Sequence, residues 1–213
     1  MTKPSMVLRA FIQARMSSTR FPGKVLAPLG AKPVLGHLVD RLCRALPRES
    51  LVVATSDQAS DDPLEAYATR LGVAVFRGPL DNVFERFRRC LERHACDAFY
   101  RICADSPLLD ESLLSRLSEK AAAHVDLVTN VFPRTYPKGH SVELLNSERF
   151  ARIDARALTA EQQEHLTKVY YDHPERFAII NVSSGDPSLA GVNYCVDTIE
   201  DLRRLEHEEA IRA

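Results

Sequence analysis

The sequence lacks the cysteine pairs and long apolar runs that mark several protein classes. None of its five cysteines forms a C-x-x-C pair, and His94 near Cys96 makes no recognisable zinc pattern. We therefore expect reduced thiols, with Cys43, Cys103 and Cys195 as small core residues within apolar stretches. The longest apolar runs are far shorter than the roughly 20 residues of a membrane-spanning helix, so we expect no membrane span.

An excess of charge of one sign is also missing. The 213 residues include 28 Lys and Arg against 29 Asp and Glu, a formal net charge of −1. This balance indicates neither a nucleic-acid partner nor an acidic membrane surface. Because residues 1–4 lead directly into an apolar strand pattern, we expect no signal peptide and a cytoplasmic protein.

Two families of motifs are missing as well. The absence of a G-x-G-x-x-G motif argues against a dinucleotide cofactor, and no order of Ser, His and Asp supports a hydrolase. The stretch Pro22-Gly23-Lys24-Val25 is not a Walker A sequence, because it lacks the upstream Gly and the Ser or Thr after Lys.

What is present is an alternation of strand and helix patterns between residues 7 and 131. Apolar strand patterns cover Val7–Ala14, Leu51–Ala54, Val73–Phe76, Phe99–Ala104 and Val125–Val131. Helical patterns cover Pro33–Leu46 and Asp61–Leu71, and two more follow caps at Asp81 and Asp110. This rhythm predicts an α/β fold with a largely parallel sheet and helices on both faces.

The rhythm breaks at Phe132. We interpret 1–213 as a single domain and 132–180 as an insertion within it, serving as a lid or a dimer contact by analogy with other folds. The expected elements are a strand at Val142–Leu145, helices at Ser147–Leu158 and Ala160–His173, returning strands at Phe177–Val182 and Val192–Val196, and a closing helix at Thr198–Glu206.

The loop from Gln13 to Lys24 joins the first strand to the first helix. It carries three cations (Arg15, Arg20, Lys24) and three hydroxyl groups (Ser17, Ser18, Thr19). Fixed cations, hydroxyls and backbone N–H groups suit a polyphosphate. The alternative is a solvated, mildly basic loop.

Two carboxylates, Asp105 and Asp197, directly follow predicted strands. Ligands of such sheets sit outside the carboxyl ends of the strands, where Thr55-Ser56-Asp57 also lies. A pair of carboxylates suits Mg²⁺, which also takes waters and phosphate oxygens. The alternative is that each Asp caps the next helix, since Asp197-Thr198-Ile199-Glu200 has the spacing of a capping box. Together with the cationic loop, the pair describes a phosphoryl-transfer site.

At these residues the chain resembles the sugar cytidylyltransferases, which include the 3-deoxy-manno-octulosonate and acylneuraminate enzymes. Among these it resembles the spore-coat polysaccharide branch in particular. The resemblance covers nearly the whole chain, in order. It rests on Ile12-Gln13-Ala14-Arg15 with Ser18-Thr19-Arg20-Phe21-Pro22-Gly23-Lys24, on Val53-Ala54-Thr55-Ser56, Phe76–Phe87, Arg101–Asp110, Thr129–Gly139 and Glu164–Thr167, and on Val196-Asp197-Thr198-Ile199-Glu200-Asp201-Leu202.

The resemblance implies a Rossmann-like (GT-A-like) nucleotidyltransferase fold, CTP as donor, Mg²⁺ as cofactor, an acidic sugar as acceptor and a homodimer. Catalysis would involve Lys24, Arg15 and Asp105, with the metal on Asp105 and Asp197. The nucleotide site would be formed by Ala14, Arg15, Ser17, Ser18, Arg20, Lys24, Thr55, Ser56 and Asp105, with Thr55 and Ser56 near the cytosine. The acceptor would face Arg134, Tyr136, His140, Glu143 and His165.

The sequence departs from the family pattern at Gly139-His140-Ser141-Val142-Glu143, where the family usually has Asp in place of Ser141. This change bears on the acceptor, for which we expect a nonulosonic acid first and an octulosonic or phosphonate-type acid next. Two other functions stay open. One is a glycosyltransferase on the same fold, although the fourth strand lacks the usual Asp-x-Asp; the other is an inactive nucleotide-binding relative.

Overall fold

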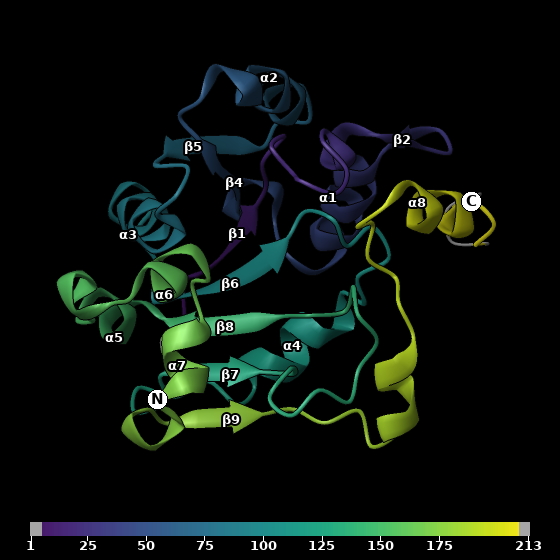
Figure 1. The fold of residues 1–213 in the computed structure, drawn as a ribbon. Coiled ribbons are helices and arrows are strands. Elements are labelled where there is room, and N and C mark those ends of the chain that lie inside the picture. Colours follow the sequence, from purple (N-terminus) through teal and green to yellow (C-terminus); the bar gives the residue numbers. More distant parts are fainter. Residues whose placement is uncertain (1–5, 209–213) are drawn as a thin grey trace.

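A seven-stranded sheet organises residues 6–208, the part of the chain that the computed structural model describes. The strand order is β5-β4-β1-β6-β8-β7-β9 (Figure 1). Only β8 runs antiparallel to its neighbours within this sheet, so the predicted, mostly parallel α/β architecture is confirmed. The strands are β1 (Leu8–Gln13), β4 (Leu51–Ser56), β5 (Ala74–Gly78), β6 (Ala98–Cys103), β7 (Leu127–Thr129), β8 (Glu143–Asn146) and β9 (Ile179–Asn181).

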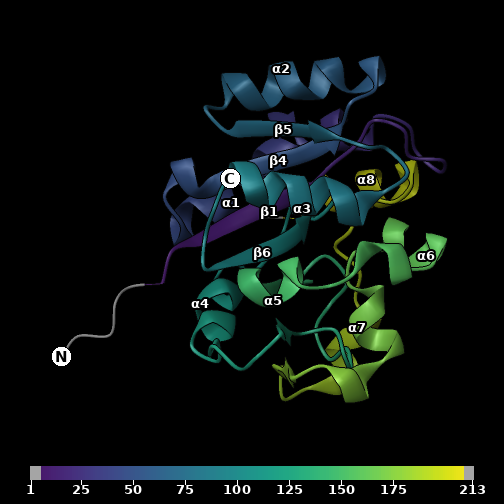
Figure 2. The same cartoon turned by 90° about the vertical axis from the view of Figure 1, so that its left-hand side faces the viewer.

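Helices cover both faces of this sheet. Buried residues of α1, α2 and α4 form one core with the sheet, and those of α3, α5 and α7 form the other. Figure 2 views the sheet from the side of α3 and α5. The helices are α1 (Val34–Ala45), α2 (Asp62–Arg70), α3 (Val83–Arg93), α4 (Ser112–Ser118), α5 (Ser147–Ala151), α6 (Ala160–Glu164), α7 (Lys168–Asp172) and α8 (Ile199–Leu205).

Short elements complete the fold. A hairpin of β2 (Pro28–Leu29) and β3 (Lys32–Pro33) leads into α1. The short 3₁₀ helices are η1 (Lys24–Leu26), η2 (Arg48–Ser50), η3 (Ala59–Asp61), η4 (Ala155–Ala157), η5 (Pro174–Arg176) and η6 (Pro187–Gly191).

The apolar strand patterns follow from burial on both faces. In β1, Ala10 and Ile12 belong to the core on the α1 side, whereas Phe11 belongs to the core on the α3 side. Successive side chains of a strand point to opposite faces, so a strand covered on both sides reads as a continuous apolar run. The Phe11 ring stacks on Phe99 of β6 with 4.9 Å between the ring centroids.

Local hydrogen bonds divide the two helical patterns that we expected after residue 146. Asp154 accepts from the backbone N–H of Arg156 and opens η4, and a capping box between Thr159 and Gln162 starts α6. The backbone of His165 leaves the helical region at φ −108° and ψ 88°, so α6 and α7 are separate. The cap expected at Asp81 is supplied by Asn82, whose side chain accepts from the backbone N–H of Glu85.

The strand expected at Val192–Val196 is wrong. Lys138 and Asn193 form an isolated bridge, and the Tyr194 N–H donates to the Lys138 carbonyl at 2.7 Å. The segment therefore runs beside residues 138–139 and pairs with no strand of the main sheet among residues 6–208.

Residues 132–180, expected as an insertion, contribute β8 and part of β9 to the main sheet. β8 lies between β6 and β7, so these two parallel strands are not neighbours. A lid or dimer role for this range stays a prediction. The expectation about residues 1–4 lies outside the described residues. Within 6–208, no helix is long and apolar enough to cross a membrane.

Candidate active site

The loop after β1 is held in place by a buried carboxylate. Asp61 accepts from the backbone N–H of Met16 at 2.7 Å and, through its second oxygen, from the Thr55 hydroxyl at 2.7 Å and the Ser56 N–H at 3.0 Å. The Ser56 hydroxyl donates to the same oxygen. This carboxylate therefore ties the end of β4 to the start of the cationic loop.

The contacts of Asp61 correct the expected role of Thr55 and Ser56. Both residues are fully buried, and their hydroxyls are occupied by Asp61. Neither lines the hollow described below. Their side chains shape the loop that we expected to bind phosphate and are not presented to a base.

We expect Asp61→Asn to destabilise the protein by about 3 kcal/mol near neutral pH, because the amide puts a donor where backbone and hydroxyl donors need an acceptor. Burial raises the pKa of Asp61, but these hydrogen bonds outweigh it and lower the pKa below the usual 3.8. A lowered pKa means that the stabilisation is complete above 3.8 and is lost as the pH falls through the folded value. Thermal unfolding of the wild type and of Asp61→Asn should show a smaller difference in melting temperature at pH 3 than at pH 7. An equal difference at both pH values would contradict this prediction.

Lys24 lies between the two aspartates that were expected to bind metal. Its Nζ is 2.6 Å from Asp105 Oδ2 and 2.8 Å from Asp197 Oδ1. Burial lowers the pKa of Lys24, but the two carboxylates outweigh it and raise the pKa above 10.5, so the ammonium group stays charged. Arg20 Nη2 adds a second cation at 3.0 Å from Asp197 Oδ1.

Neither aspartate acts as a helix cap. The capping box of α8 is formed by Thr198 and Asp201, one residue later than the spacing from Asp197 suggested. The side chain of Asp201 accepts from the backbone N–H groups of Asp197 and Thr198, both at 3.0 Å. The Asp197 carboxylate is therefore free of the helix and faces Lys24.

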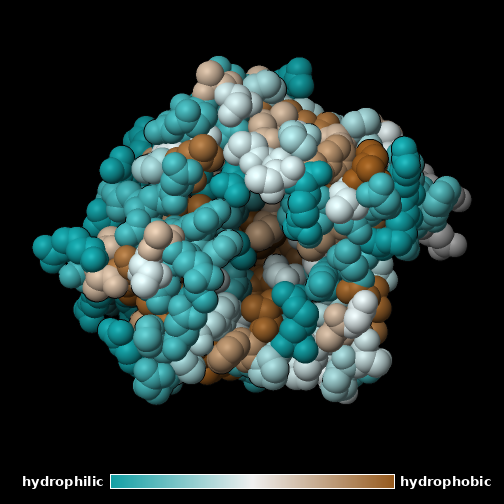
Figure 3. Space-filling view, in the orientation of Figure 1, coloured by the Kyte–Doolittle hydropathy of each residue, from teal (hydrophilic) through white to brown (hydrophobic). Residues whose placement is uncertain are grey.

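A hollow of about 310 Å³ opens at this edge of the sheet. Figure 3, in the orientation of Figure 1, shows the surface hollowed near its centre, over the end of β6. Eight of the predicted site residues line it: Ala14, Arg15, Ser18, Arg20, Lys24, Asp105, His165 and Asp197. The exposed Ser17 does not. The hollow thus brings together the cations of the loop, two carboxylates and the His165 imidazole.

Sequence comparison identifies the group to which this arrangement belongs. The family described as cytidylyltransferase matches residues 10–210. The chain belongs to the cytidylyltransferase family. The spore coat polysaccharide biosynthesis protein SpsF of Bacillus subtilis (strain 168) is 36% identical over 202 residues, covering 92% of this chain and 83% of SpsF. The resemblance seen in the motifs is therefore confirmed.

Solved structures agree with this assignment. A cytidylyltransferase from Leptospira borgpetersenii serovar Hardjo-bovis (strain JB197) aligns with a TM-score of 0.90 at 28% identity, covering 95% of this chain and 86% of that one. A CMP:2-keto-3-deoxy-manno-octonic acid synthetase complexed with CTP aligns at 0.71 and 16% identity, covering 94% and 97%. The latter likeness shows the shared Rossmann-like fold.

The carboxylates of this cytidylyltransferase fit a divalent cation. Asp105 and Asp197 already converge on one cationic group, the Lys24 ammonium. Residues 6–208 contain no cluster of three or more His, Cys, Asp or Glu that could hold a metal. Mg²⁺ often takes only one or two protein carboxylates and completes its shell with water and substrate phosphate. Asp105 and Asp197 are compatible with this coordination, and the magnesium site stays a prediction.

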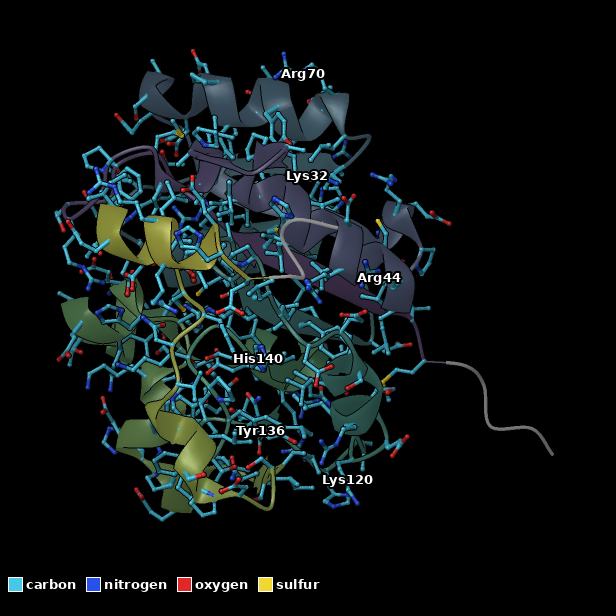
Figure 4. All side chains as sticks on the ribbon, turned by 90° about the vertical axis from the view of Figure 1, so that its right-hand side faces the viewer. Lys32, Arg44, Arg70, Lys120, Tyr136 and His140 are labelled. Carbon is cyan, nitrogen blue, oxygen red and sulfur yellow. The ribbon has the colours of Figure 1, made fainter. Side chains whose placement is uncertain are left out.

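Two residues expected on the acceptor side lie elsewhere in the cytidylyltransferase, and Figure 4, a view from the α8 side, labels both. Tyr136 is buried, and its hydroxyl donates to the Ser183 carbonyl at 3.3 Å. His140 lines a different hollow, between α1 and α4, where its ring stacks on Tyr194. Burial lowers the pKa of His140, which favours the neutral ring. Neither side chain lines the hollow at Lys24.

Arg134 and Glu143 also lie outside the lining of this hollow. Arg134 Nη1 donates to the Ser141 hydroxyl at 3.0 Å, at the position where the sequence departs from the family pattern. Glu143 is 2% exposed and pairs with Arg101, whose Nη1 is 3.0 Å from Glu143 Oε2. Glu143 is buried because β8 lies inside the sheet, between β6 and β7.

Sequence reasoning missed four residues of the hollow, namely Gln13, Val25, Cys103 and Ala104. Gln13 and Cys103 end β1 and β6, are paired in register and line the hollow together. All five cysteines are free thiols, as expected, but Cys103 is half-buried at the site and is not a core residue. The parallel pairing of the two strand ends was the available signal, since neighbouring strands place paired side chains on the same face.

Proposed function

We propose that this cytidylyltransferase transfers CMP from CTP to an acidic sugar and releases pyrophosphate, with Mg²⁺ as its cofactor. The observation that carries the proposal is the position of Lys24 between Asp105 and Asp197, at a hollow that Arg15 and Arg20 also line. Cations aimed at a departing pyrophosphate beside two carboxylates are the parts that nucleotidyl transfer needs.

The proposed reaction is a single displacement. The acceptor hydroxyl gives its proton to water and its oxygen forms a bond to the α-phosphorus of CTP. The bond from that phosphorus to the α–β bridging oxygen breaks, and pyrophosphate leaves with the electron pair. Arg15, Arg20 and Lys24 stabilise the charge on the departing group. When bound by Asp105 and Asp197, Mg²⁺ would neutralise phosphate charge and lower the pKa of the acceptor hydroxyl.

The proposal of an acidic acceptor rests on the family. SpsF is named for spore coat polysaccharide biosynthesis, and the synthetase aligned above is named for an octonic acid. His165, at the junction of α6 and α7, lines the hollow and is a candidate contact for the acceptor. A nonulosonic acid is the first candidate, followed by an octulosonic or phosphonate-type acid.

The test is pyrophosphate release with Mg²⁺, each of the four nucleoside triphosphates and a panel that includes N-acetylneuraminate and 3-deoxy-manno-octulosonate. We expect release with CTP and one acid, and little with the other triphosphates. Thermal stabilisation by CTP with Mg²⁺ but no release would favour an inactive relative. If no triphosphate binds, the glycosyltransferase becomes the better assignment.

A homodimer that uses residues 132–180 and a cytoplasmic location belong to the same proposal. The homodimer rests on the family resemblance, whereas the cytoplasmic location rests on the unpaired cysteines and the short apolar runs of the sequence. Sedimentation of the purified protein would measure directly whether it forms a homodimer.

A further inference from the structure

The carboxamide of Gln13, which lines the hollow, is held in one orientation. Its Oε1 accepts two hydrogen bonds from Arg101, from Nε at 3.0 Å and from Nη2 at 2.8 Å. A guanidinium group only donates, so the amide atom that faces it has to be the oxygen. The chemistry of the contact therefore decides which end of the amide points away from Arg101.

The guanidinium group of Arg101 is held in place by a second contact, with Glu143. Its Nη1 donates to the buried carboxylate of Glu143 at 3.0 Å, and the Tyr171 hydroxyl donates to the other oxygen of that carboxylate. Burial and the charge of Glu143 raise the pKa of Tyr171, so this hydroxyl keeps its proton. The chain of contacts from α7 through β8 and β6 ends at Gln13 on β1, and the charges of Arg101 and Glu143 balance.

The NH₂ end of the amide is left for the hollow. Gln13 lines the hollow with Cys103 and His165, and no hydrogen bond joins its Nε2 to another residue within 6–208. Phe11, two residues earlier on the same face, packs on the α3 side. The NH₂ group thus lies on the side of α6 and α7, whereas the neighbouring Ala14 side chain packs into the opposite core.

An amide whose oxygen is occupied offers two donors and no acceptor. That pattern matches a group that only accepts, such as a carboxylate, and gives a neutral hydroxyl no acceptor for its proton. We propose that Gln13 is the residue that binds the carboxylate of the acceptor, with its donors aimed by Arg101 and Glu143. This inference rests on the proposed transfer of CMP to an acidic sugar and adds the residue that would select the acid.

Two substitutions of similar size separate ligand binding from structural support. Gln13→Glu keeps an oxygen for Arg101 but replaces the donors with a second carboxylate oxygen. Gln13→Met removes the contact with Arg101 and the donors, but adds no charge. We measure KM for the acid that the wild type uses from the panel, and KM for CTP, with thermal unfolding as the check on folding.

If Gln13 binds the acceptor carboxylate, Gln13→Glu should raise the acceptor KM about a hundredfold and Gln13→Met about tenfold, from charge repulsion and from lost hydrogen bonds respectively. KM for CTP should change by less than about threefold, because the triphosphate contacts other residues. If Gln13 only supports Arg101, the order of the two effects on the acceptor KM reverses. Gln13→Glu then has the KM of the wild type, and Gln13→Met has the larger rise in KM.

The remaining outcomes are also decisive. An equal rise in KM for CTP and for the acid would overturn the assignment to the acceptor. Wild-type kinetics in both variants would overturn any role of Gln13 in binding. Failure of the wild type to transfer CMP to any acid of the panel would instead overturn the proposed function, and this inference with it.

Discussion

Asp105→Asn is expected to reduce CTP-dependent pyrophosphate release by a factor on the order of 10³ while leaving the fold intact. The amide has the same shape, but it removes one of the two carboxylates that surround Lys24 Nζ. A charged side chain stabilises a reacting phosphate more strongly in a hollow that excludes part of the water. Loss of one such stabilising group typically lowers the rate by a factor of roughly 10²–10³. Loss of a metal ligand would add to this cost. Steady-state assays on both forms, with thermal unfolding, measure the effect.

Asp110→Asn is the matched control for this substitution. Asp110 is an aspartate of the same connection after β6, but its side chain accepts from the Ser112 N–H at 3.0 Å near the start of α4. Asparagine accepts at a helix start about as well as aspartate, so this substitution should cost little stability and little activity. Near wild-type turnover of Asp105→Asn would contradict the metal assignment, and equal losses in the two variants would mean that the connection, and not the charge at the site, is responsible.

The elements that sequence predicted best are those whose signal is local. The strand patterns that became β1, β4, β5 and β6 are apolar because both sheet faces are covered. The cationic loop and Asp105 could be placed at one edge because parallel strands share a direction. Asp197 was placed there from a strand that does not form; it reaches the same edge because the Val196 N–H donates to the Asp105 carbonyl. No distance was needed for that inference, and the hollow contains Arg15, Lys24, Asp105 and Asp197 together.

The predictions that were wrong concern contacts between residues far apart in the sequence, and a helix cap that lies one residue from the expected position. Sequence could not show that Asp61 occupies the hydroxyls of Thr55 and Ser56, because that contact depends on how η3 folds back. It also could not show that β8 enters between β6 and β7, since strand neighbours are set by the whole chain. For α8, a shift of one residue moved the cap from Asp197 to Thr198 and left Asp197 available at the site.

Gly139→Ala should destabilise the protein by about 3 kcal/mol and reduce activity by displacing Asp197. Gly139 has φ +93°, and a Cβ there would be 2.6 Å from the Tyr194 carbonyl carbon and 2.9 Å from the Cys195 nitrogen. These are backbone atoms and cannot rotate away, so the strained φ, worth roughly 1–2 kcal/mol, is joined by a clash. The neighbouring segment is tied to the site, because the Val196 N–H donates to the Asp105 carbonyl at 2.9 Å.

Gly185→Ala separates the two causes. Gly185 has φ +84°, but no atom lies within 4 Å of a Cβ at that position. It should therefore show only the conformational cost, a fall in melting temperature of roughly 2–6 °C for a chain of this size, with unchanged turnover. The melting temperature of Gly139→Ala should fall further. This variant should also lose CTP-dependent pyrophosphate release, even at temperatures where it remains folded. Equal effects of the two substitutions would mean that contact with the segment at 194–195 does not position Asp197, and that the aspartate is held by the capping contacts of α8 alone.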